Sequence, residues 1–155
     1  VCIFMKKIIL AVILSISAIL QTAVFAENDE ITVTINGEKL ESPIPAQIVN
    51  ERTMLPMRSV FETLGAKVTW AGDDKLIFAT KGKTFITMKI GVPQMVVQTT
   101  DSDESEVITL DTAPFIDSDY TLIPVRAVAE ALSADVDWID ETRTVVITNS
   151  KGTLD

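Results

Sequence analysis

The chain has 155 residues and a formal net charge of −9, with 22 acidic and 13 basic side chains. Such an acidic protein lacks the basic surface that neutralises phosphates, so we expect no nucleic-acid partner. The chain contains no histidine and one cysteine, Cys2. This composition argues against nucleophiles activated by histidine and against zinc or copper sites, which take imidazole or thiolate ligands.

Residues 1–26 are predicted to be a signal peptide. Lys6 and Lys7 precede an almost entirely apolar stretch, Ile8 to Leu20, and small residues follow up to Ala26. The apolar stretch is shorter than the roughly twenty residues that a membrane-spanning helix needs. We expect cleavage after Ala26 and a secreted, extracellular protein, with association with the cell wall left open. Contact with a membrane is expected only through an uncleaved signal segment.

The exported chain is predicted to begin with β-structure. Residues 31–35 alternate strictly between apolar and polar side chains and run into Asn36-Gly37, the strongest short hairpin signal. Residues 38–41 are therefore expected to form the return strand. Because the prolines at positions 43 and 45 interrupt pairing, residues 46–49 are expected to form a separate short strand.

The stretch from Thr53 to Trp70 is written again as Thr121 to Trp138 at a uniform offset of 68, and nine of eighteen positions are identical. In each copy a short extended segment ends at proline, which is well placed in the first turn of a helix. Alternation resumes after the helix, and an acidic turn leads into a last strand. Ten residues form the signature of the repeat: Pro56, Arg58, Glu62, Leu64, Trp70, Pro124, Arg126, Glu130, Leu132 and Trp138.

Each copy is expected to bury one face of its helix. The apolar residues of the two helices fall at helical spacing. Arg58 and Glu62, like Arg126 and Glu130, stand four residues apart and can pair on the exposed side. Gly65 easily takes the left-handed conformation that ends a helix, whereas the second copy has Ser133 there, so we expect the second helix to end less favourably.

A second alternating run, residues 86–90, matches residues 31–35 with an offset of 55, so thirteen residues are inserted in the second copy. Most of this insertion is the acidic run at residues 98–106, which is expected to be a mobile loop. The predicted organisation is a repeat at 27–82, a second repeat at 83–150 and a tail at 151–155. The predicted fold is α+β: two pseudo-repeated units, each a twisted antiparallel sheet of hairpins packed against one short helix.

The motif Thr-x-x-Pro-x-Arg, followed by an apolar helix, Leu-Gly-Ala or Leu-Ser-Ala, and Val-x-Trp, resembles the copper amine oxidase N-terminal-like domain. This "stalk" domain occurs in many exported proteins of Gram-positive bacteria. The resemblance implies a sheet packed on a helix, often joined to wall-binding or hydrolytic domains. It implies no copper chemistry, because the copper of those oxidases is held by three histidines in a separate catalytic domain.

Carboxylates are the remaining candidates for chemistry, and glycosidases use them in pairs. Asp73 with Asp74, and Asp140 with Glu141, are more simply interpreted as turn residues. Residues 101–106 resemble the start of a calcium loop but lack the glycine and the glutamate that follow in an EF-hand.

The two tryptophans, which could stack on sugar rings, alternate with valines and are expected to be buried. We therefore predict no catalytic, cofactor or metal residues and a non-catalytic module that binds a cell-wall or envelope protein or glycan. A carboxylate-based glycan hydrolase and a calcium-responsive adhesion module are the alternatives.

Overall fold

A computed structural model describes residues 29–149, in which β-strands predominate and two short helices occur, α2 (Met57–Thr63) and α3 (Val125–Ala131). The predicted signal peptide and tail lie outside the described residues. The strands are β1 (Thr32–Ile35), β2 (Glu38–Lys39), β3 (Gln47–Val49), β4 (Arg52–Pro56), β5 (Lys67–Ala71), β6 (Leu76–Lys81), β7 (Thr84–Lys89), β8 (Gln94–Thr99), β9 (Ser105–Thr109), β10 (Phe115–Asp117), β11 (Tyr120–Pro124), β12 (Ala134–Ile139) and β13 (Thr144–Asn149).

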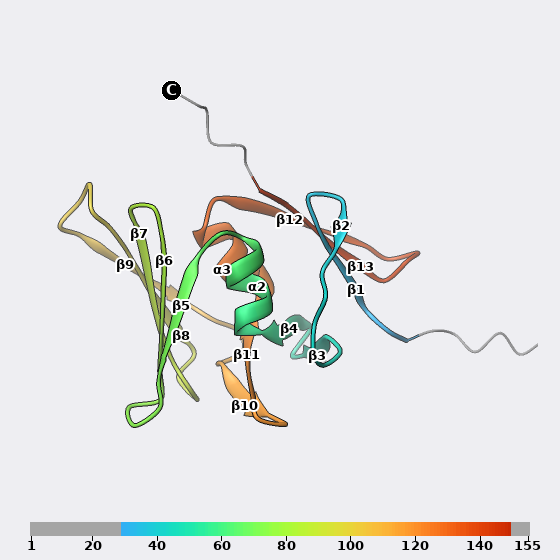
Figure 1. Cartoon of the computed structure of the whole chain (residues 1–155), viewed down its shortest axis with the longest axis horizontal. Helices are drawn as coiled ribbons and strands as arrows, with labels where there is room; N and C mark the ends of the chain where they lie inside the picture. Colours follow the sequence, from blue (N-terminus) through green and yellow to red (C-terminus); the bar gives the residue numbers. More distant parts are fainter. Residues whose placement is uncertain (1–28, 150–155) are drawn as a thin grey trace, which may run out of the picture.

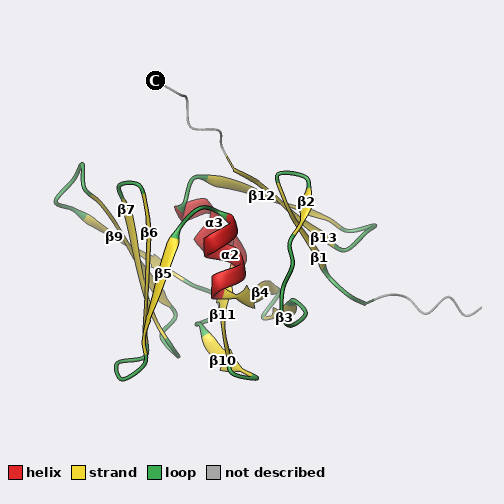
Figure 2. Ribbon diagram, in the orientation of Figure 1, coloured by secondary structure: helices red, strands yellow, loops and turns green. Residues whose placement is uncertain are grey.

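The described strands form three sheets, in the orders β5-β6-β7-β8-β9, β12-β13-β1-β2 and β10-β11-β4-β3. The first two sheets flank the helices, and the third lies below them (Figures 1 and 2). Helix α2 contacts β5 and helix α3 contacts β12, and both helices contact β4 and β11 of the central sheet. The fold is therefore α+β, as the sequence predicts at this level.

Neither outer sheet is built from one of the expected units. Strands β6 and β7 are joined by the two-residue turn Gly82-Lys83, so they must pair as an antiparallel hairpin. Strand β7 therefore extends the sheet of the first unit. At the other end of the chain, β1 pairs in parallel with β13, with Val33 opposite Val145 and Ile35 opposite Ile147. The prediction of one self-contained sheet per unit is wrong, because strands of the unit at 27–82 and strands of the unit at 83–150 lie in the same sheets.

The central sheet joins the two sequence copies directly. Strand β4 pairs antiparallel with β11, with Leu55 opposite Ile123. The hairpins β3–β4 and β10–β11 turn at Asn50-Glu51 and at Ser118-Asp119, all four with positive φ between 50° and 67°. The predicted Asn36-Gly37 hairpin also forms, with φ values of 51° and 85°. Such left-handed pairs match the twist of the strands that they join.

The predicted helix faces are buried. Both helices begin directly after a buried proline, Pro56 or Pro124, which ends the preceding strand and does not lie in the first turn of the helix. The apolar face of each helix packs into one core together with the inward residues of the outer sheets. The buried residues are Met57, Val60 and Phe61 of α2 with the C-cap Leu64, and Val125, Val128 and Ala129 of α3 with the C-cap Leu132.

The acidic run at residues 98–106 forms the tip of a hairpin, and five of its nine residues make the expected loop. Its first residues belong to β8 and its last to β9, so only residues 100–104 connect strands. The inward positions Met95, Val97 and Ile108 pack on the core or within it, and burying them favours the paired form. Lys83 Nζ lies 2.7 Å from Asp101 Oδ1 and ties the connection to the neighbouring turn.

Candidate binding groove

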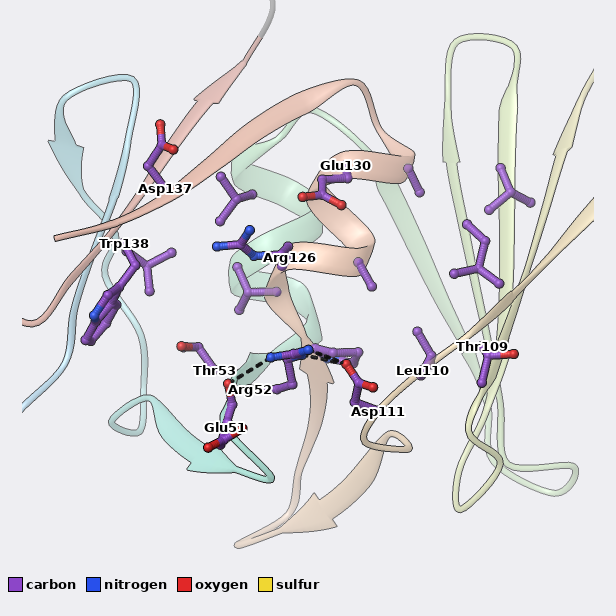
Figure 3. A pocket seen from close by; sticks show the side chains of 18 of the residues that line it. Glu51, Arg52, Thr53, Thr109, Leu110, Asp111, Arg126, Glu130, Asp137 and Trp138 are labelled. Atoms are coloured by element: carbon purple, nitrogen blue, oxygen red, sulfur yellow. Dashed lines mark hydrogen bonds and ion pairs between the residues drawn. The ribbon is translucent and has the colours of Figure 1, made fainter. Parts of the chain in front are cut away.

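A groove of about 1270 Å³ lies between the two outer sheets on the side of helix α3. Figure 3 shows it from close by, with helix α3 at its floor and residues of both outer sheets at its sides. Below α3 the groove is bordered by the β3–β4 turn and by the segment that follows β9. We call it the β9–β12 groove, after the two edge strands that line it.

The walls of the groove come from alternate positions of paired strands. On one side they are Val97 of β8 and Ile108 of β9, and on the other Val136 and Trp138 of β12. Because side chains two residues apart share one face of a strand, Val136 and Trp138 belong to the same face of their sheet. The hairpin β8–β9 exists only through the thirteen-residue insertion, so this wall has no counterpart in the shorter β1–β2 hairpin.

The floor of the groove carries charged side chains. Arg126 and Glu130 project from helix α3, and below them Arg52 pairs with Asp111 (Figure 3). Arg52 Nε and Nη2 each lie 2.6 Å from Asp111 Oδ2, and Nη1 donates a hydrogen bond of 3.3 Å to the Glu51 carbonyl. This ion pair is about half exposed, so it orients the arginine more than it stabilises the fold.

Trp138 is exposed, contrary to the prediction that both tryptophans are buried. Its exposed fraction is 37%, whereas Trp70 is partly buried against the core. Burial falls along the inward positions of β12, from Ala134 through Val136 to Trp138, because α3 covers only the beginning of the strand. The Trp138 indole Nε1 donates a hydrogen bond of 3.2 Å to Asp140 Oδ1. The equivalent position in the first copy is Gly72, whose missing side chain leaves the Trp70 indole nitrogen unobstructed.

The signature residues of the repeat lie in the interior, along the groove or on the exposed side of α2. Pro56, Leu64 and Leu132 are buried in the interior, while Pro124, Arg126, Glu130 and Trp138 line the groove. On α2, Arg58 Nη1 and Glu62 Oε1 form the expected exposed pair at 3.4 Å. The expected pair between Arg126 and Glu130 does not form.

Sequence reasoning missed Arg52, Glu51 and Asp111 as groove residues. Arg52 and Asp111 are 59 positions apart, and no repeated motif connects them. The segments of Arg52 and Asp111 come together only because the hairpin β3–β4 pairs with the hairpin β10–β11, through β4 and β11. The apolar residues of 107–110 do indicate a strand, but the acidic run before them gives no sign that this strand pairs with β8.

The described residues contain no cluster of metal-binding side chains. Within residues 29–149 no three histidine, cysteine, aspartate or glutamate side chains gather as ligands for a metal. Asp73 and Asp74 lie in the β5–β6 turn, and Asp140 and Glu141 in the β12–β13 turn. No helix in this part of the chain has the length and hydropathy that crossing a membrane requires.

The family model described as "Copper amine oxidase N-terminal domain" matches residues 34–147, most of the chain. The chain belongs to the copper amine oxidase N-terminal domain family. The match runs from within β1 to within β13 and includes the insertion that builds the β8–β9 wall. It confirms the resemblance carried by the repeated Pro-x-Arg and Val-x-Trp motifs.

A copper amine oxidase N-terminal domain is the non-catalytic part of those oxidases. The donor set of this member does not fit copper, because the chain has no histidine and its one cysteine is Cys2. A protein named "Protease inhibitor" from Brevibacillus choshinensis is 29% identical over 117 residues. The match covers 76% of this chain and 34% of the relative, so the chain spans about a third of that protein's length. No solved structure matches the chain.

Proposed function

We propose that this protein is an exported, non-catalytic stalk-domain module that binds an envelope protein or glycan through the β9–β12 groove. The observation that carries the proposal is the groove itself. The groove has a volume of about 1270 Å³ and lies between two sheets. Among its charged side chains, Arg52 pairs with Asp111, and Asp140 accepts a hydrogen bond from the Trp138 indole. A large concave surface is the usual form of a binding site.

The proposed scaffold is a pair of repeats arranged about an approximate two-fold axis. Strands β4 and β11, helices α2 and α3, and strands β6 and β13 have bounds that differ by the offset of the sequence repeat. Leu55 and Ile123 occupy equivalent positions and also face each other, as residues beside such an axis must. In this proposal the units at 27–82 and 83–150 are repeats in sequence that exchange strands in space.

The proposed location is outside the cell, after cleavage behind Ala26. This part of the proposal is tested by expressing the gene in a Gram-positive host and sequencing the N-terminus of the protein in the medium. A mature chain that starts at Glu27 supports export. A product that keeps residues 1–26 and stays with the cells contradicts it.

The binding function is tested with the purified chain and with isolated cell walls and envelope proteins. We expect saturable retention that a large substitution at the groove floor, Ala127→Trp, reduces. Ser59→Trp, at the equivalent position of α2, is the matched control and should leave retention unchanged. If neither walls nor envelope proteins retain the chain, the proposed function is wrong.

Inhibition of a protease is a second candidate function, because the matching relative carries that name. An inhibitor is also a non-catalytic protein that binds another protein in an extended contact. Titration of the chain against serine proteases of trypsin and subtilisin type and against a metalloprotease, with residual activity as the readout, tests it. Stoichiometric loss of activity supports inhibition, and unchanged activity at a large excess of the chain excludes it.

A further inference from the structure

The β9–β12 groove is strongly acidic. Its lining includes six carboxylates and two guanidinium groups, which leaves an excess of four negative charges. One of the arginines, Arg52, is already paired with Asp111. The remaining carboxylates are those of Glu51, Glu106, Glu130, Asp137 and Asp140. A charged groove with low-dielectric walls attracts a ligand of opposite sign.

An exposed aromatic ring stands among these carboxylates. Trp138 lines the groove, and Asp140 holds its indole N–H at 3.2 Å, which fixes the edge of the ring. Tryptophan is the best aromatic partner for an ammonium or guanidinium group. Carboxylates beside such a ring bind the same group through charged hydrogen bonds. The combination is suited to the side chains of lysine and arginine.

The form of the groove is suited to an extended chain. Among the described strands, β9 pairs only with β8 and β12 only with β13, so both groove strands have an unpaired edge. An extended peptide can add to such an edge and place alternate side chains into the groove. The volume of about 1270 Å³ also exceeds the usual range for small-ligand pockets.

We propose that the β9–β12 groove binds an extended, lysine- or arginine-rich polypeptide segment of a partner protein. This inference rests on the proposed function, in which the groove is the binding surface of the module. A second copy of the chain is a poor occupant, because each copy carries a net charge of −9. A neutral glycan would stack on the tryptophan and donate hydroxyl hydrogen bonds to the carboxylates, but it would leave their excess negative charge unbalanced.

The first test is calorimetric titration of the purified chain with three probes. The probes are a ten-residue peptide of alternating lysine and threonine, its counterpart of glutamate and threonine, and a neutral chitin oligosaccharide. We expect saturable binding of the lysine peptide alone, with an affinity that falls severalfold as salt is raised, because screening weakens exposed charge pairs. Binding of the glutamate peptide, or of the oligosaccharide in place of the lysine peptide, overturns the proposal.

The second test uses neighbouring charges of opposite sign on helix α3. Glu130→Gln should weaken binding of the lysine peptide about threefold, and Arg126→Gln should strengthen it by a similar factor. The matched controls, Glu62→Gln and Arg58→Gln, lie at the equivalent positions of α2 and outside the groove. We expect no change in either control. Effects of the same sign for Glu130 and Arg126, or equal effects on α2, overturn the assignment of the site.

The third test addresses the tryptophan. Trp138→Ala should weaken binding about threefold or more, as expected for loss of a cation–π contact. Phe85→Ala is the control, because Phe85 has a similar exposed fraction, 40%, and does not line the groove. Failure of all three tests while cell walls still retain the chain would refute the basic segment and leave the proposed function intact. If cell walls do not retain the chain but the lysine peptide binds tightly, the basic segment is supported and the proposed function is refuted.

Discussion

Leu55 of β4 lies directly opposite Ile123 of β11, although the two residues occupy the same position in the two sequence copies. Both side chains are almost fully buried. Directly opposed residues of an antiparallel pair hold their Cβ atoms about 5 Å apart. The two copies therefore meet at these residues, and the central sheet is a joint product of both.

Truncation of either residue should be costly. We expect Leu55→Ala and Ile123→Ala each to lower the free energy of unfolding by about 3 kcal/mol, because each leaves a cavity in the core. The controls are Ile48→Ala and Ile116→Ala, which also occupy equivalent positions in the two copies but are 47% and 51% exposed. These should cost less than about 1 kcal/mol in urea denaturation. Equal costs for the buried and the exposed pair would contradict the central role of β4 and β11.

The two sequence repeats should not fold when separated. A fragment of residues 27–82 lacks β13, with which β1 pairs, and β11, with which β4 pairs. A fragment of residues 83–155 lacks β6, β4 and β1, each of which pairs with one of its strands, β7, β11 and β13 respectively. We expect each fragment to give the amide spectrum of an unfolded chain by NMR, and an equimolar mixture to regain dispersed signals. A dispersed spectrum from one fragment alone would show that a repeat is independent.

Replacement of Ser133 by glycine should stabilise the protein. Ser133 has φ +63° after helix α3, a conformation that costs a residue with a side chain about 1 kcal/mol, and Gly65 has φ +80° after α2. We expect Ser133→Gly to raise the free energy of unfolding by about 1 kcal/mol, and Gly65→Ser to lower it by a similar amount. Chemical denaturation measures both. The two substitutions should change the free energy of unfolding in opposite directions. A loss of stability in Ser133→Gly would refute the explanation that Ser133 is strained by its positive φ.

The two tryptophans should differ in their contribution to stability. Trp70 packs against the core, so Trp70→Ala should cost about 2 to 3 kcal/mol. Trp138 is exposed in the groove, and Trp138→Ala should cost less than about 1 kcal/mol. Thermal unfolding followed by circular dichroism compares the variants. Similar losses of melting temperature would mean that Trp138 is a core residue after all.

Much of the local structure could be predicted because it depends on neighbours along the chain. The buried faces of α2 and α3 follow from apolar residues at helical spacing, and the Asn36-Gly37 hairpin follows from residues that accept positive φ. The strand β8 was missed, because the acidic run that follows it favours a loop when it is read alone. Its partner β9 supplies the backbone hydrogen bonds that make the hairpin stable.

The sequence by itself determined the helices, most of the strands and the family of this protein, since each depends on a local pattern or a repeated motif. Only the tertiary structure decided that β1 closes against β13, that Trp138 is exposed, and that Arg52 meets Asp111. The two contacts join residues that are more than 100 and 59 positions apart, respectively. Their formation depends on which sheet edges and faces remain uncovered once the core has packed, and no pattern within a short window of sequence records that outcome.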